Sequence, residues 1–138
     1  LQMIIVQAAE LDLVLCLENM FPRYQSFFEA RDFTDILQTY PGLKITLDVG
    51  HANIKSPRGQ RFLEFMHAHG DRIGHVHLSD NHGSRDDHLP IGAGNVKWGK
   101  VVQALQECNY DETVTLEVFS ENRTDLHKSL LKVKSLFK

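Results

Sequence analysis

The sequence has few of the features that mark membrane, secreted or nucleic-acid-binding proteins. No apolar run approaches the roughly 20 residues of a membrane-spanning helix, and no signal peptide is recognisable. The two cysteines, Cys16 and Cys108, have no ligand-like spacing, so we expect both to be reduced and packed. No run rich in lysine or arginine occurs, and the net charge of −3 gives no basis for a nucleic-acid interface. These absences favour a cytoplasmic protein.

What is present is the composition of an ordinary globular domain. The 138 residues are 42% hydrophobic and 24% charged, which suffices for one domain with a core. No linker or low-complexity segment divides them, so we expect a single domain over residues 1–138. The chain begins at Leu1, inside a segment of helical character, and we therefore expect it to be truncated at its N-terminus.

Short apolar, β-branched runs alternate with segments of helical periodicity. The expected strands lie at 13–19, 43–51, 72–80 and 112–119. The expected helices lie at 1–10, 25–42, 56–70 and 97–111, followed by a C-terminal helix with an apolar stripe formed by Leu126, Leu130, Val133 and Phe137. This alternation indicates parallel strands joined by right-handed crossovers.

Side chains alternate between the two faces of a strand, and this parity gives each expected strand one apolar and one polar face. The polar faces end, in register, in Glu18, Asp48, His77 and Glu117. Parallel strands of an α/β fold bring their carboxyl ends to one rim, where active sites are built. The sequence therefore predicts that these four side chains meet there.

A divalent metal ion explains such a set of side chains. Three adjacent carboxylates repel one another unless a cation holds them, and carboxylates with one imidazole suit Mn²⁺, Mg²⁺, Co²⁺ or Zn²⁺. Each residue alone has an ordinary explanation: Glu18 could cap a helix, Asp48 could lie in a turn before Gly50, and His77 could be a core histidine. Their joint occurrence favours the metal site.

Five segments carry a resemblance to a known family: "LEN" (17–19), "LDVGH" (47–51), "HVHLSD" (75–80), "DDHLPIGAG" (86–94) and "LEVF" (116–119). In this order and spacing they resemble the xylose isomerase-like TIM-barrel superfamily, which includes sugar (phosphate) isomerases and epimerases, inosose dehydratase-like proteins and endonuclease IV. The resemblance implies an α/β fold of the TIM-barrel type. The chain would be its C-terminal half, with four parallel strands (strands five to eight) and flanking helices.

The resemblance also implies roles for individual residues. The four metal ligands of the single-metal ketose epimerases are matched by Glu18, Asp48, His77 and Glu117, of which Glu18 and Glu117 would also transfer the proton. His51 matches a residue that binds substrate in the epimerases and a second metal in endonuclease IV, where Asp86 and His88 match a further pair of ligands. The arginine that contacts substrate in ketose 3-epimerases has no counterpart, although Gly83 and Arg85 lie near its position.

The implied activity is that of a divalent-metal-dependent sugar or sugar-phosphate isomerase or epimerase, which transfers a proton through a metal-stabilised enediolate. One alternative is an endonuclease IV-like phosphodiesterase acting on abasic DNA. Another is an inactive fragment or assembly module that retains the motif, and we expect the fragment alone to be inactive. An open four-stranded sheet exposes edges near Val14 and Val118, so we also expect a homodimer or higher oligomer.

Overall fold

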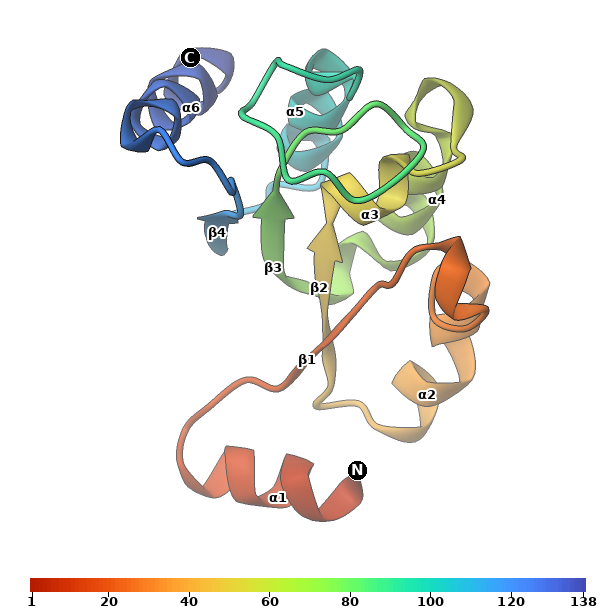
Figure 1. Ribbon diagram of the computed structural model, residues 1–138. Coiled ribbons are helices and arrows are strands. Elements are labelled where there is room, and N and C mark those ends of the chain that lie inside the picture. The colour runs from red at the N-terminus through yellow and green to blue at the C-terminus, as the bar shows by residue number, and fades with distance from the viewer.

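A parallel sheet forms the centre of the fold (Figure 1). The computed structural model describes residues 1–138 apart from the side chain of Pro57. Four strands lie in chain order, and they are β1 (Cys16–Glu18), β2 (Lys44–Asp48), β3 (Ile73–Leu78) and β4 (Thr113–Leu116). Every neighbouring pair is parallel. The expected half-barrel arrangement of four parallel strands is confirmed, although each strand is shorter than its sequence segment.

Helices precede, connect and follow the strands. They are α1 (Gln2–Glu10), α2 (Thr34–Thr39), α3 (Val49–Asn53), α4 (Gln60–His69), α5 (Trp98–Glu107) and α6 (Arg123–Leu136), with the 3₁₀ turns η1 (Pro22–Tyr24), η2 (Ala30–Phe33), η3 (Pro57–Gly59) and η4 (Gly70–Arg72). The expected helix at 25–42 is replaced by η2 and the short α2. Here the Asp32 carboxylate accepts the backbone N–H groups of Phe28 and Glu29, which holds this stretch in a turn.

The core lies between the sheet and the helices that cover its outer face. On the two central strands the outward side chains Ile45, Leu47, Val76 and Leu78 are at most 1% exposed, as strand parity predicts. Phe33 and Phe65 pack edge to face above them, with ring centroids 5.3 Å apart. Complete burial of one such side chain contributes about 1.5–3 kcal/mol, so this layer fixes the two central strands and their carboxyl ends.

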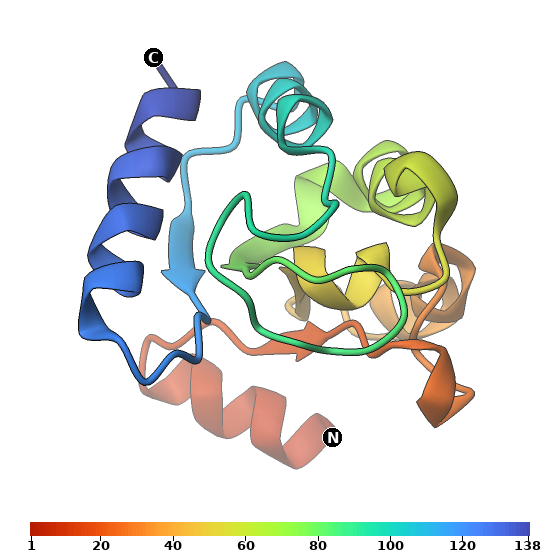
Figure 2. The same cartoon turned by 45° about the horizontal axis from the view of Figure 1, so that its top comes forward.

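The expected C-terminal helix is present, but of its apolar stripe only Val133 packs against the core. The other three residues, Leu126, Leu130 and Phe137, are 47%, 40% and 39% exposed. The helix α6 lies beside β4, the last strand of the sheet (Figure 2), so in the described chain only one side of the helix has a partner. Cys108 is also exposed rather than packed, whereas Cys16 is half-buried, and both thiols are free.

The helix α1 stands apart from the other helices, beyond the start of β1 (Figure 1). None of its described residues is buried, and Met3, Ile4 and Val6 are each more than half exposed. None of the described helices has both the length and the apolar character needed to cross a bilayer.

Candidate functional site

The carboxyl ends of β2 and β3 place Asp48 directly opposite His77 in the sheet register. The other two candidate ligands are staggered. Glu18 pairs with Thr46, two residues before Asp48, and Glu117 follows a strand in which Thr115 is the partner of His77. The sequence pattern had suggested that the four residues lie level with one another, and the structure shows that they do not. Because each offset is two residues, all four still lie on the same face of the sheet.

Three carboxylates converge on one ring nitrogen. The Nδ1 of His77 lies 3.7 Å from an oxygen of Glu18, 3.7 Å from Oδ2 of Asp48 and 3.2 Å from Oε1 of Glu117. Glu18, Asp48 and His77 each offer one ligand atom within 4.8 Å of the others. Glu117 is not one of these three residues, but its Oε1 also lies close to the Nδ1 of His77.

The electrostatics of this cluster suit a bound cation. Asp48 is 0% exposed, yet within the described part of the chain neither its Oδ2 nor the Nδ1 of His77 has a hydrogen-bond partner. The carboxylates of Asp48 and Glu18 raise the pKa of His77 to about 10, and His77 in turn lowers the pKa of Glu18. The imidazolium of His77, with His51 beside Glu18, thus offsets the charge of the three carboxylates.

The donor set fits a divalent ion. Ligand atoms lie about 2.0–2.2 Å from an ion such as zinc, so two ligands of the same ion are roughly 3.0–3.5 Å apart. The contacts of 3.2–3.7 Å around His77 are close to this spacing. Asp48 Oδ2 and His77 Nδ1, which lack hydrogen bonds to any described residue, are the atoms that an ion would engage.

Asn19 and the short helix α3 hold Asp48 in place, and the sequence pattern predicted neither. The Oδ1 of Asn19 accepts the backbone N–H of Asp48 at 2.6 Å, and its Nδ2 donates to the Asp48 carbonyl at 3.2 Å. Asp48 caps α3 by accepting the His51 backbone N–H through Oδ1 at 2.7 Å. This leaves Oδ2 directed at His77. An asparagine directly after a strand-ending glutamate was the available signal in "LEN".

A second group, His51, Asp86 and His88, borders the first. The ring of His51 donates through Nδ1 to the Asn19 carbonyl at 2.8 Å, and its Nε2 lies 3.2 Å from Oδ2 of Asp86. The Nε2 of His88 lies 3.0 Å from the same oxygen. Burial is the largest single influence on the pKa of His51 and lowers it. The hydrogen bond to Asp86, the charges of Asp48 and Asp86 and the Asn19 carbonyl together outweigh burial and raise this pKa to about 9.

This second group is in contact with the carboxylate cluster on both sides. His51 Nδ1 lies 3.4 Å from Oε1 of Glu18, and His88 Nδ1 donates to the Glu117 carbonyl at 2.9 Å. The structure thus brings all seven candidate residues to one rim. Asp86 Oδ1 is buried without a hydrogen bond to the described residues, so this group also has an oxygen available for a ligand.

Asp80 organises the long loop after β3 that carries Asp86 and His88, and sequence reasoning missed it. It is fully buried. Its Oδ1 accepts the backbone N–H of Asn81 and Val96, and its Oδ2 accepts those of Gly92 and the Trp98 indole, all at 2.9–3.1 Å. Trp98 itself is buried and packs within the core. The loop therefore passes over the strand ends in a fixed path (Figure 2).

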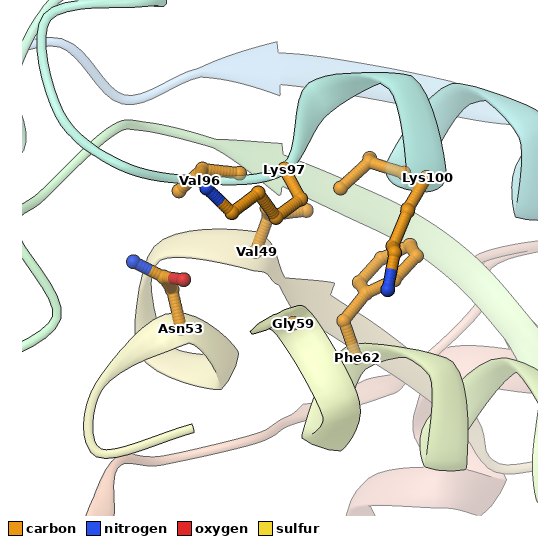
Figure 3. A pocket seen from close by; sticks show the side chains of 8 residues that line it. Val49, Asn53, Gly59, Phe62, Val96, Lys97 and Lys100 are labelled. Carbon is orange, nitrogen blue, oxygen red and sulfur yellow. The ribbon is translucent and has the colours of Figure 1, made fainter. Parts of the chain in front are cut away.

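A small apolar pocket lies away from this rim, between α3, α4 and α5. Figure 3 shows Val49, Phe62 and Val96 at its walls, with Lys97 and Lys100 beside it. Its volume is about 10 Å³, which is no more than one water molecule needs. This pocket is a packing defect of the outer layer and no candidate for a substrate.

Comparison with known proteins agrees with this geometry. A family model described as xylose isomerase-like TIM barrel matches residues 2–136. D-psicose 3-epimerase of Enterocloster bolteae is 32% identical over 117 residues, or 81% of this chain and 36% of that protein. The uncharacterized protein MJ1614 of Methanocaldococcus jannaschii is 32% identical over 117 residues, or 85% of this chain and 44% of that protein. The chain thus spans less than half the length of these relatives.

Solved structures show the same fold. The crystal structure of a D-tagatose 3-epimerase-like protein superposes with a TM-score of 0.82 at 30% identity, over 98% of this chain and 51% of that one. D-allulose 3-epimerase from Methylomonas sp. superposes with a TM-score of 0.71 at 25% identity, over 92% of this chain and 43% of that one. The resemblance carried by the sequence segments is therefore confirmed: the chain belongs to the xylose isomerase-like TIM barrel family, and its four parallel strands form half of such a barrel.

Proposed function

We propose that the protein is a divalent-metal-dependent isomerase or epimerase of a sugar or sugar phosphate. One observation carries the proposal: the buried Asp48 Oδ2 faces His77 Nδ1, neither has a hydrogen bond within the described residues, and two further carboxylates reach the same nitrogen. The epimerases among the relatives and solved structures support the same reaction class.

In this proposal Glu18, Asp48, His77 and Glu117 hold one ion, which is Mn²⁺, Mg²⁺, Co²⁺ or Zn²⁺. When bound, the ion supplies Lewis-acid polarisation of the sugar's carbonyl and hydroxyl oxygens, which acidifies the C–H bond between them.

Glu18 and Glu117 are the proposed proton-transfer groups. Glu18 ends β1 and Glu117 follows β4, so their carboxylates approach the rim from opposite edges of the sheet. The lowered pKa of Glu18 keeps its carboxylate ionised and able to accept a proton. A base on each side of a planar carbon can remove a proton from one face and return it to the other, which is the requirement of an epimerase.

His51 is the proposed substrate contact next to Glu18. Its ring is fixed between the Asn19 carbonyl and Asp86, and its positive charge stabilises negative charge that develops on a substrate oxygen. Asp86 and His88 then position His51. The buried Oδ1 of Asp86, which has no hydrogen bond to a described residue, favours a second possibility, that His51, Asp86 and His88 hold a further ion, as an endonuclease-like phosphodiesterase requires.

Metal content and solvent exchange test the proposal together. The chain is loaded with Mn²⁺ and incubated with D-psicose in deuterated water, alone and within a longer polypeptide that contains it, since the chain matches less than half the length of its relatives. We expect one ion per chain in both proteins and deuterium at the carbon next to the carbonyl with the longer polypeptide, and chelation should remove both the ion and the exchange. Exchange that survives chelation contradicts the proposal, and two or more ions favour the phosphodiesterase.

A cytoplasmic location and self-association belong to the same proposal. The two free cysteines agree with a reducing compartment.

A further inference from the structure

A second, larger pocket opens beside the His51–Asp86 contact. Its volume is about 610 Å³, within the range of about 300–1,000 Å³ found for small-molecule sites. It is lined by Phe21, Pro22, Arg23, Ile54, Lys55, Ser84, Arg85 and Asp86. Phe21 packs on the His51 ring with centroids 5.0 Å apart, and Asp86 bonds the same ring. The pocket is thus separated from Glu18 by one imidazole.

The charges in this pocket are unbalanced. The carboxylate of Asp86 is already engaged by two histidines, and Arg85 is paired with Asp87. Arg23 and Lys55 are exposed, and neither forms an ion pair with any residue that the structure describes. Two unpaired cations therefore remain where a ligand would enter.

Further positive charge lies on the far side of Lys55. That residue also lines an adjoining pocket of about 500 Å³, together with Asn53, Ser56, Arg58, His82, Gly83, Asn95 and Lys97. No carboxylate is among these described lining residues. The whole chain carries a net charge of −3, so this side of the rim is a local exception that attracts anions.

We propose that the Arg23–Lys55 pocket binds the phosphate of a phosphorylated sugar whose carbonyl end lies at the carboxylate cluster. The proposal rests on the isomerase function above and narrows its substrate class from sugars in general to sugar phosphates. Arginine and lysine form charge-assisted hydrogen bonds with phosphate oxygens. In this arrangement Arg23 and Lys55 determine specificity and take no part in the proton transfer.

The test compares ribulose 5-phosphate with unphosphorylated ribulose on the Mn²⁺-loaded protein by calorimetry. We expect ribulose 5-phosphate to bind at least about tenfold more tightly than ribulose. Arg23→Gln and Lys55→Gln should each weaken the binding of ribulose 5-phosphate about tenfold, which corresponds to the lower end of the contribution of a hydrogen bond to a charged group. Binding of ribulose itself should not change. Lys134→Gln removes the same charge from α6 and is the matched control. Equal affinity for both sugars overturns the proposal, as does an equal effect of Lys134→Gln.

A third probe separates this proposal from the isomerase function. Inorganic phosphate is titrated into the metal-free protein and followed by the amide resonances of Arg23 and Lys55. Saturable shifts there that disappear in Lys55→Gln support the pocket even if neither sugar exchanges protons, in which case the isomerase function fails alone. Shifts of the same size at the lysines of α6 show an adventitious ion only and overturn the pocket. If deuterium exchange is equally fast with ribulose and with ribulose 5-phosphate, the isomerase function stands and the proposed phosphate binding in the Arg23–Lys55 pocket is overturned.

Discussion

Asp48 and His77 face each other across β2 and β3, with Asp48 Oδ2 3.7 Å from His77 Nδ1 and neither atom hydrogen-bonded within the described structure. A buried polar group without a partner costs about 1–3 kcal/mol, and more when it is charged. The backbone around Asp48 is nevertheless fixed by Asn19 and α3. The fold thus holds two buried polar atoms that have no hydrogen-bond partner among the described residues close to the spacing of two ligands of one ion, which supports the proposed metal site.

Substitution of His77 by alanine should abolish metal binding. It removes the nitrogen on which three carboxylates converge, and we expect the affinity for Mn²⁺ to fall by at least about a hundredfold, because even loss of a residue that supports a ligand costs about 10–100-fold. Calorimetry measures the change. His67→Ala, at an exposed position of α4, should bind the ion normally. Wild-type affinity in His77→Ala would remove the metal assignment.

Glu18→Gln and Glu117→Gln should each reduce deuterium exchange at the carbon next to the sugar carbonyl by about 10²–10⁴-fold, the usual contribution of a general base. Glutamine keeps an oxygen that can contact the ion but cannot accept the proton. Metal content is measured in parallel, so that a lost ion is not mistaken for a lost base. Glu121→Gln, at an exposed position beyond β4, is the control. Undiminished exchange in both variants excludes the two-carboxylate mechanism.

Metal affinity should rise with pH. The pKa of His77 is raised to about 10 by Asp48 and Glu18, so at neutral pH the ion must displace a proton from the ring before it binds. For one displaced proton the affinity increases about tenfold per pH unit below that pKa. Between pH 6 and pH 8 we expect a gain of about a hundredfold for Mn²⁺. Calorimetry in buffers of different ionisation enthalpy should show release of about one proton, and a pH-independent affinity would contradict this assignment.

Asp80→Asn should destabilise the fold while leaving the carboxylate cluster intact. The carboxylate accepts four N–H groups in a fully buried position, whereas an amide places its own N–H₂ against two of these donors. We expect the free energy of unfolding to fall by about 3 kcal/mol, as measured by urea denaturation. The exposed Asp71→Asn should change it by less than about 0.5 kcal/mol.

The sequence was sufficient to predict which residues meet at the rim. Strand parity places Glu18, Asp48, His77 and Glu117 on one face whatever the exact register, because any even offset preserves the face. It could not predict the stagger, since the offset between strands depends on how the sheet curves. That is why the four side chains were expected to be level and are not.

The features that the sequence did not reveal depend on contacts distant in the chain. Asn19 acts on Asp48, which is 29 residues away, and Asp80 acts on Trp98, which is 18 residues away. Periodicity carries no signal for such buried polar pairs. The exposed stripe of α6 shows the reverse case: Leu126 and Leu130 have the pattern of a packed helix, but a pattern cannot show whether a partner surface is present.

The open sheet predicts that the 138-residue chain associates with a second copy. In the described sheet β1 and β4 each pair with one neighbour, and unpaired edges template association. The inner face is also uncovered and lines a hollow of about 430 Å³ that includes Val14 and His75. Two copies related by a two-fold axis would pair edge to edge and close an eight-stranded barrel.

We expect a dimer or larger assembly in sedimentation at micromolar concentration. Val14→Lys, which places a charge in that hollow, should shift it toward monomer, whereas Gln103→Lys on the exposed side of α5 should not. A compact wild-type monomer that unfolds cooperatively at this concentration would refute the association.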